Sequence, residues 1–175
     1  MIDFSRNHFE LFGLPERFGC DGESLDRAYR ALQNEVHPDR FAAADEASRR
    51  IALQSSARVN EAYRALKEPV DRAQYLLSLH GIDVLAETDS ALPFEFLERQ
   101  LERREAVAEA QAARDVAALE RLHREVAADR ATIEQELAAL LDGQCAWEAA
   151  RMRVRELKFL GKLAADVDGI LGELE

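Results

Sequence analysis

The stretch Val36-His37-Pro38-Asp39-Arg40-Phe41 lies between two segments whose apolar residues recur at helical spacing. Proline disfavours the α conformation at the residue before it, so Pro38 predicts that the first of these helices ends near Val36 or His37. The imidazole and carboxylate of the motif then fall on a short exposed loop between two rigid supports, where binding residues concentrate. On chemistry alone a second interpretation stays open: a plain helix end with His37 near the favourable dipole terminus.

The two helices that flank the motif predict an antiparallel hairpin, because a short loop brings them side by side. Asp21 is suited to cap the first, since its carboxylate accepts hydrogen bonds from free backbone N–H groups. Its apolar face is expected at Leu25, Tyr29, Leu32 and Val36. The second helix is expected from about Asp45 to Lys67, where Pro69 stops it. Its buried face is expected at Ile51, Ser55, Val59, Ala62 and Leu66.

The rest of the chain predicts a three-helix bundle, and short helices at 7–12 and 70–79 complete the hairpin part. Pro93 suits the first turn of a helix that runs to about Ala113. The core positions of the next two helices follow the three-four spacing of bundles: Leu119, Leu122, Val126, Ile133, Leu137, Leu140, Trp147, Val154, Leu157, Leu160, Leu163 and Val167. No strand alternation appears, so we expect an all-α fold. The expected division is a hairpin domain, a connector and a bundle, over residues 1–81, 82–92 and 93–175.

Charge and cysteine content exclude several classes of function. The 175 residues carry a net charge of −11, and residues 82–175 hold 21 acidic against 12 basic side chains. This half lacks the basic footprint that phosphate binding needs, so nucleic acid is not its expected partner. Cys20 and Cys145 form no metal-binding motif and fit a reducing compartment. Without a signal peptide or a span of about 20 apolar residues, we expect a soluble cytoplasmic protein.

Motifs spread along nearly the whole chain carry a family resemblance. They are Leu11-Phe12-Gly13-Leu14-Pro15, His37-Pro38-Asp39-Arg40-Phe41, Gln54-Ser55-Ser56, Val59-Asn60, Arg72-Ala73-x-Tyr75-Leu76-Leu77-x-Leu79-x-Gly81, Gln100-Leu101-Glu102-x-Arg104-Glu105 and Lys158-Phe159-Leu160-x-Lys162-Leu163. The first part resembles a J-domain. The whole chain resembles the HscB family, the J-protein co-chaperones of iron–sulfur cluster assembly.

The resemblance implies a function and two partners. The chain would bind the scaffold protein IscU, deliver it to an ATP-loaded HscA-like heat-shock chaperone and stimulate the chaperone's ATPase, which promotes cluster transfer. It would be no enzyme and would hold no cofactor, metal or cluster, and it would work in the bacterial cytoplasm. The chaperone site carries over onto His37, Pro38 and Asp39. Asp39 can pair with an arginine across the interface through charge-assisted bonds.

Two further groups of site residues are weighed against plainer structural roles. Arg27 and Arg30 lie about one turn apart and could add a basic edge to the chaperone site, although an ordinary solvated face is the alternative. The scaffold site carries over onto Leu97, Leu101, Glu102, Glu105, Glu109 and Phe159. Leucines at this spacing are usually core residues, but Phe96 and Val107 offer the same helix another core face. Phe159 has the alternative of bundle core, and Glu98 stands where relatives often have an apolar Met.

Other functions fit the sequence less well. The same architecture could serve a different client protein. An enzyme that uses His37 and Asp39 as an acid–base or metal pair would lack a nucleophile, a third ligand and a phosphate loop. A purely structural helical adaptor would leave the His-Pro-Asp motif unexplained.

Overall fold

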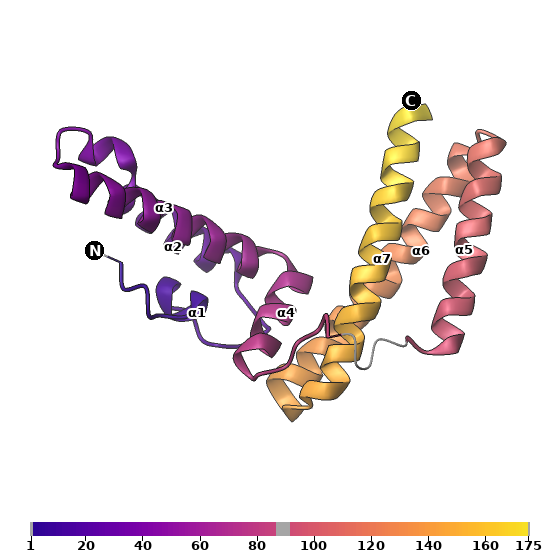
Figure 1. Ribbon diagram of the computed structural model, residues 1–175. Helices are drawn as coiled ribbons and strands as arrows, with labels where there is room; N and C mark the ends of the chain where they lie inside the picture. The colour runs from indigo at the N-terminus through magenta and orange to yellow at the C-terminus, as the bar shows by residue number, and fades with distance from the viewer. Residues whose placement is uncertain (1, 87–91, 175) are drawn as a thin grey trace. The chain divides into compact units, whose positions relative to one another are not determined.

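The computed structural model describes residues 2–86 and 92–174, and over these ranges it consists of helices and turns without a strand (Figure 1). The expected all-α fold is confirmed. The chain divides into two compact units, Met1–Leu79 and His80–Glu175, and each is described by itself. Residues 87–91 of the expected connector lie outside the described ranges. No helix in the described part is both long and apolar enough to cross a membrane.

The first unit contains α1 (His8–Phe12), α2 (Gly22–Val36), the 3₁₀ turn η1 (Pro38–Phe41), α3 (Glu46–Lys67) and α4 (Pro69–Leu79). Polar caps set the beginnings of its helices. Asn7 and Glu10 form a capping box at α1, and the side chains of Asp21 and Asp45 accept backbone N–H groups at α2 and α3. Gly13, at φ 64°, closes α1 in the left-handed conformation that favours glycine.

The hairpin of α2 and α3 closes around a core that follows the sequence pattern with one shift, and Tyr29 and Leu32 of the expected α2 face are half-buried. Ser55, Val59, Ala62 and Leu66 are buried as predicted, together with Leu25 and Val36 of α2. The prediction of Ile51 was one residue off, because Ala52 is buried in its place and Ile51 is half-buried. Adjacent residues of a helix point about 100° apart. Such a shift therefore changes which residue lies at the edge of the buried face, while the centre of that face stays where it was predicted.

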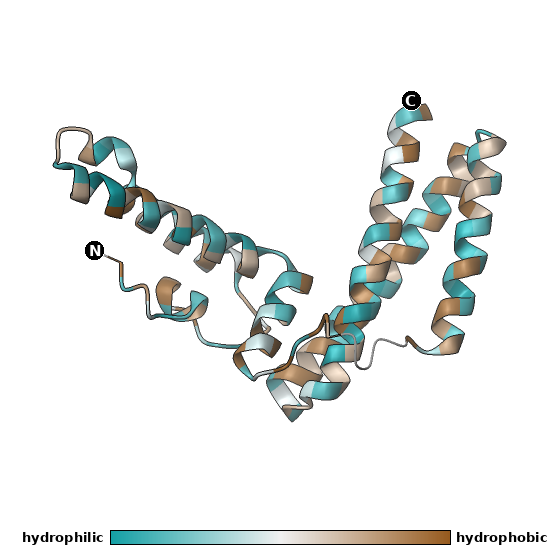
Figure 2. Cartoon of the chain, in the orientation of Figure 1, coloured by the Kyte–Doolittle hydropathy of each residue, from teal (hydrophilic) through white to brown (hydrophobic). Residues whose placement is uncertain are grey.

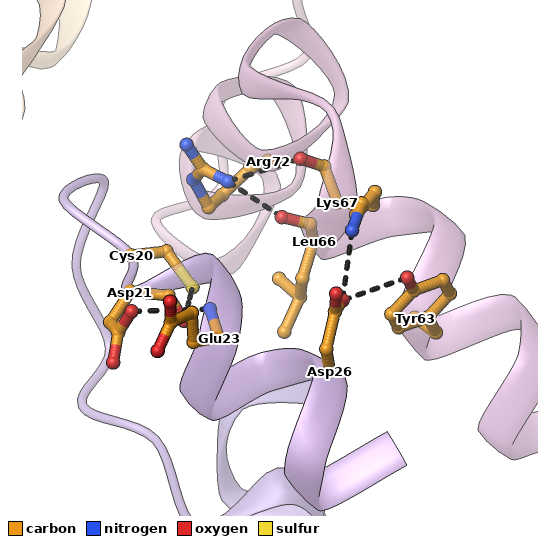
Figure 3. Close-up of polar contacts among 8 residues, drawn as sticks. All are labelled: Cys20, Asp21, Glu23, Asp26, Tyr63, Leu66, Lys67 and Arg72. Atoms are coloured by element: carbon orange, nitrogen blue, oxygen red, sulfur yellow. Dashed lines mark hydrogen bonds and ion pairs between the residues drawn. The ribbon is translucent and has the colours of Figure 1, made fainter. Parts of the chain in front are cut away.

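Polar contacts tie the ends of these helices together (Figure 3). The Arg72 guanidinium is buried and donates from Nε to the Phe18 carbonyl and from Nη1 to the Leu66 carbonyl, each at 2.7 Å. Asp26 of α2 accepts from the Tyr63 hydroxyl and from Lys67 Nζ of α3, both at 2.8 Å (Figure 3). Hydrogen bonds to charged groups are among the stronger ones in proteins. The two bonds to Asp26 therefore help to set the register of α2 against α3.

His8 is buried at the contact between α1 and α4. Its ring stacks on Tyr75 with centroids 4.1 Å apart, and its backbone N–H donates to the Tyr75 hydroxyl at 3.0 Å. Burial, with a smaller contribution from the Arg58 charge, lowers the pKa of His8 below the ordinary value of 6.5. The folded chain therefore favours the neutral imidazole.

We expect the free energy of unfolding to fall as the pH is lowered through 6.5, because the unfolded chain then binds a proton that folded His8 resists. The contribution of neutral His8 is complete above that pH and is lost toward the lower folded pKa. Urea unfolding at about pH 7.5 and about pH 5.5 measures the difference. His8→Phe should keep the ring stack and flatten this slope relative to the wild type. An unchanged slope in His8→Phe would exclude His8 as its source.

The second unit contains α5 (Phe94–Ala112), α6 (Val116–Ala138), the π-helical turn η3 (Ala139–Gln144) and α7 (Trp147–Leu174). α6 packs mainly against α7, and α5 packs against both. Apolar residues recur along each helix in Figure 2. The buried residues include Leu119, Val126, Ile133, Leu137, Val154, Leu157, Leu160, Leu163 and Val167, all of them predicted.

Three core predictions in this unit were only partly right. Leu122 and Leu140 are half-buried, and Leu141 is buried instead of Leu140. A π turn takes more residues than an α turn, so η3 rotates the following residue toward the core. Trp147 is half-buried and stacks on His80, with ring centroids 3.8 Å apart.

Candidate partner-binding sites

The His-Pro-Asp motif forms a single 3₁₀ turn at the end of the hairpin, where the sequence predicted a loop. His37 ends α2 and caps η1, since its Nδ1 accepts the Asp39 backbone N–H at 3.3 Å. Pro38 opens the turn, where its missing N–H costs nothing. Arg40 Nη1 donates to the Asn34 carbonyl at 2.9 Å and fastens η1 to α2. The motif is therefore held at both ends.

The Asp39 carboxylate is displayed to solvent on this turn. Its side chain is 90% exposed, and the carboxylate lies 3.5 Å from His37 Nδ1. Asp39 thus keeps its lone pairs for an incoming donor, and a guanidinium is the best geometric match for a carboxylate.

A polar cluster between α2 and α3 holds the supports of the motif in place. Asn60 Oδ1 accepts from the Tyr29 hydroxyl at 2.9 Å and from Gln33 Nε2. Tyr29 also stacks on Tyr63, with centroids 4.1 Å apart. These contacts join the facing sides of α2 and α3. They therefore hold in place the two helices between which the His-Pro-Asp turn lies.

Of the two arginines expected to form a basic edge on α2, Arg27 has acidic side chains next to it. Arg27 is exposed, but its guanidinium donates to Ser24 Oγ at 2.7 Å and lies 3.6 Å from Glu23 and 3.9 Å from Asp21. Neighbouring carboxylates thus compensate the charge of Arg27. Arg30 is exposed on the same helix.

In the second unit, α5 carries an apolar strip that is not part of the core. Leu97 is 42% and Leu101 is 60% exposed, and Gln100, Val107 and Ala110 are the residues that α5 buries. The core alternative for the two leucines is therefore wrong for this bundle. Phe94, at 77% exposure, extends the strip and was missed by the sequence analysis. Its spacing of three from Leu97 was the available signal.

Acidic side chains continue the α5 surface beyond this strip. Glu102, Glu105 and Glu109 are all exposed, and so is Glu98. Leu97, Leu101, Glu105 and Glu109 are spaced by four, which on a helix produces one slanting line with a drift of about 40° per step. The exposed surface of α5 therefore passes from apolar to negative along the helix.

Phe159 belongs to α7 and reaches this part of α5. It is half-buried and makes an edge-to-face contact with Phe96, with centroids 5.8 Å apart. The Arg104 guanidinium lies 5.1 Å from the Phe159 ring centroid. Phe159 thus packs between helices and is only half-buried, which is compatible with both of the roles expected for it.

Comparisons with known proteins agree with both halves of this description. The DnaJ domain family matches residues 7–75, and the family described as HSCB C-terminal oligomerisation domain matches residues 92–168. The co-chaperone protein HscB homolog of Burkholderia multivorans is 46% identical over 175 residues, which cover 100% of this chain and 99% of that one. The homolog from Paraburkholderia phymatum is 48% identical over 167 residues, 95% of each chain.

Solved structures match the same full-length architecture. Chaperone HscB from Vibrio cholerae has a TM-score of 0.87 at 40% identity, over 97% of this chain and 100% of that chain. The human co-chaperone protein HscB has a TM-score of 0.89 at 28% identity, over 95% of this chain and 82% of that chain.

Proposed function

The chain belongs to the HscB family of co-chaperones, and from this premise we propose that it presents the scaffold protein IscU to an HscA-like heat-shock chaperone. It stimulates the ATPase of that chaperone, and the coupled hydrolysis promotes cluster transfer to acceptor proteins. The observation that carries the proposal is the exposed Asp39 carboxylate, 90% accessible on a turn fixed at both ends.

Each unit contributes one binding surface. The first binds the ATP-bound chaperone through His37, Pro38 and Asp39, with Arg30 as a further basic contact and Arg27 as a locally compensated one. The second binds IscU through Leu97, Leu101 and Phe159, and its negative rim is formed by Glu102, Glu105 and Glu109. Joining both surfaces in one chain raises the effective concentration of IscU at the chaperone. The iron–sulfur cluster stays with IscU as cargo, in the bacterial cytoplasm.

A co-purification experiment separates this proposal from its main alternative. We expect immobilised chain to retain both IscU and the HscA-like chaperone in the presence of ATP. Asp39→Asn should lose the chaperone and keep IscU, because the two surfaces are distinct. Retention of the chaperone with a different client and without IscU would favour a J-domain co-chaperone of the same architecture with another client.

We further propose that the functional domains are residues 1–81 and 93–175, joined by 82–92. A fragment of residues 1–81 is expected to stimulate the chaperone weakly, because it retains the motif and loses the IscU tether. A fragment of residues 82–175, which keeps the connector segment, should bind IscU without stimulating hydrolysis. Circular dichroism of both fragments checks that they fold. Unfolded fragments would mean that the boundary cuts a shared core.

A further inference from the structure

We propose that the IscU-binding surface includes a pocket lined by Leu85 and Lys162. This pocket takes an apolar side chain of IscU that has a carboxylate next to it. The inference rests on the proposed function and specifies the chemistry of the partner. The pocket has a volume of about 340 Å³ and is lined by Val84, Leu85, Arg155, Lys158, Phe159 and Lys162. Phe159 already belongs to the proposed IscU site, so the pocket is continuous with it.

The backbone on either side of Leu85 is fastened to α7. Arg155 donates from Nε to the Val84 carbonyl at 2.7 Å and from Nη2 to the Ala86 carbonyl at 2.9 Å. The Leu85 N–H donates to Asp83 Oδ1 at 2.8 Å, and the Val84 side chain is 2% exposed. Three hydrogen bonds therefore hold this segment in place.

Against this fixed backbone, the Leu85 side chain remains 63% exposed. Holding the backbone of an exposed leucine with three hydrogen bonds does not bury its side chain, so the side chain adds no hydrophobic stabilisation to the isolated fold. The same arrangement favours binding, because a preorganised apolar residue loses little conformational freedom when a partner covers it. Leu85 thus differs from a solvent-facing leucine in the middle of a helix, whose position is set by the helix itself.

The charges around Phe159 specify the occupant. The α5 side carries Arg104 over the Phe159 ring and then Glu102, Glu105 and Glu109, whereas the pocket on α7 is edged by Lys158 and Lys162. This basic edge occurs in a half of the chain with 21 acidic and 12 basic residues. A partner that presents basic groups toward α5 and a carboxylate beside its apolar anchor complements both sides. Such opposed charges fix orientation and discriminate against other partners.

Calorimetric titration of the full-length chain with IscU tests the proposal. We expect Leu85→Ala to weaken binding by about fivefold or more, because the truncation removes apolar surface that the partner covers. Arg155→Met should weaken it similarly and add little in the double variant, because Arg155 acts by positioning Leu85. Lys162→Glu should weaken binding at low salt and approach the wild type at high salt. Leu53→Ala is the matched control, since Leu53 is 62% exposed in the first unit, and Leu101→Ala is the positive control.

The outcomes separate this inference from the proposed function. If Leu101→Ala weakens binding and Leu85→Ala binds like the wild type, the pocket inference is overturned and the proposed function stands. If the wild-type chain does not bind IscU, both fall. Sedimentation of each variant alone tests a second copy of the chain as occupant. A change of self-association in Leu85→Ala with unchanged IscU affinity would also overturn the inference.

Discussion

Asp39→Asn is expected to abolish stimulation of the chaperone's ATPase while the helical content of the chain stays unchanged. The substitution keeps the size of the side chain and removes the charge that, in our proposal, pairs with an arginine of the chaperone. Because Asp39 is 90% exposed, its contacts within the chain contribute little to the fold. Removing one partner of a charge pair that an interface buries costs about 2–5 kcal/mol, which is about thirtyfold or more in affinity.

Single-turnover ATP hydrolysis, with and without the variant, measures this effect. Asp71→Asn is a suitable control, because Asp71 is an exposed carboxylate in the same unit but belongs to α4. Circular dichroism of both variants checks the helices. Wild-type stimulation by Asp39→Asn would rule out the motif as the coupling element.

Leu101→Ala is expected to weaken IscU binding by about tenfold or more, with a nearly unchanged melting temperature. In the proposed interface this leucine becomes buried, and burying a leucine contributes about 1.5–3 kcal/mol. The free chain loses little, because Leu101 is 60% exposed. Leu119→Ala provides the contrast: Leu119 is 0% exposed in the same unit, and its truncation should cost about 2–5 kcal/mol of unfolding free energy.

Calorimetry and thermal unfolding of the two variants together distinguish a binding role from a packing role. A large drop in the melting temperature of Leu101→Ala, comparable with that of Leu119→Ala, would assign Leu101 to the core. Salt adds a second measurement, because rim charges such as Glu102 and Glu105 mainly set the association rate and are screened. Binding of the wild type should weaken from low to physiological salt. Salt-independent binding would leave the carboxylates without a role.

Helix ends and most core positions were predictable from the sequence because their causes are local. The carboxylates of Asp21 and Asp45 cap their own helices, and Pro38 ends α2 through its effect on the preceding residue. The errors came from geometry that the sequence does not encode locally. Regular α spacing places Leu140 in the core, but the π turn η3 buries Leu141.

The candidate sites were less predictable, because exposure depends on tertiary packing. Leu97 and Leu101 have the spacing of core leucines, and only the packing of α5 through Gln100 and Val107 leaves them exposed. The sequence contained no pattern that indicated a binding role for Leu85. It lies in a segment without periodicity, and the residue that positions it, Arg155, comes from a distant helix.

The central claim is that one chain couples IscU to the ATPase of an HscA-like chaperone. Single-turnover ATP hydrolysis by that chaperone, with the chain and IscU added separately and together, tests it most directly. We predict that both together accelerate hydrolysis beyond the product of their separate effects. Leu101→Ala should lose that excess and keep the acceleration by the chain alone, and Asp39→Asn should lose both. Equal rates with and without the wild-type chain, at concentrations that saturate IscU, would contradict the account.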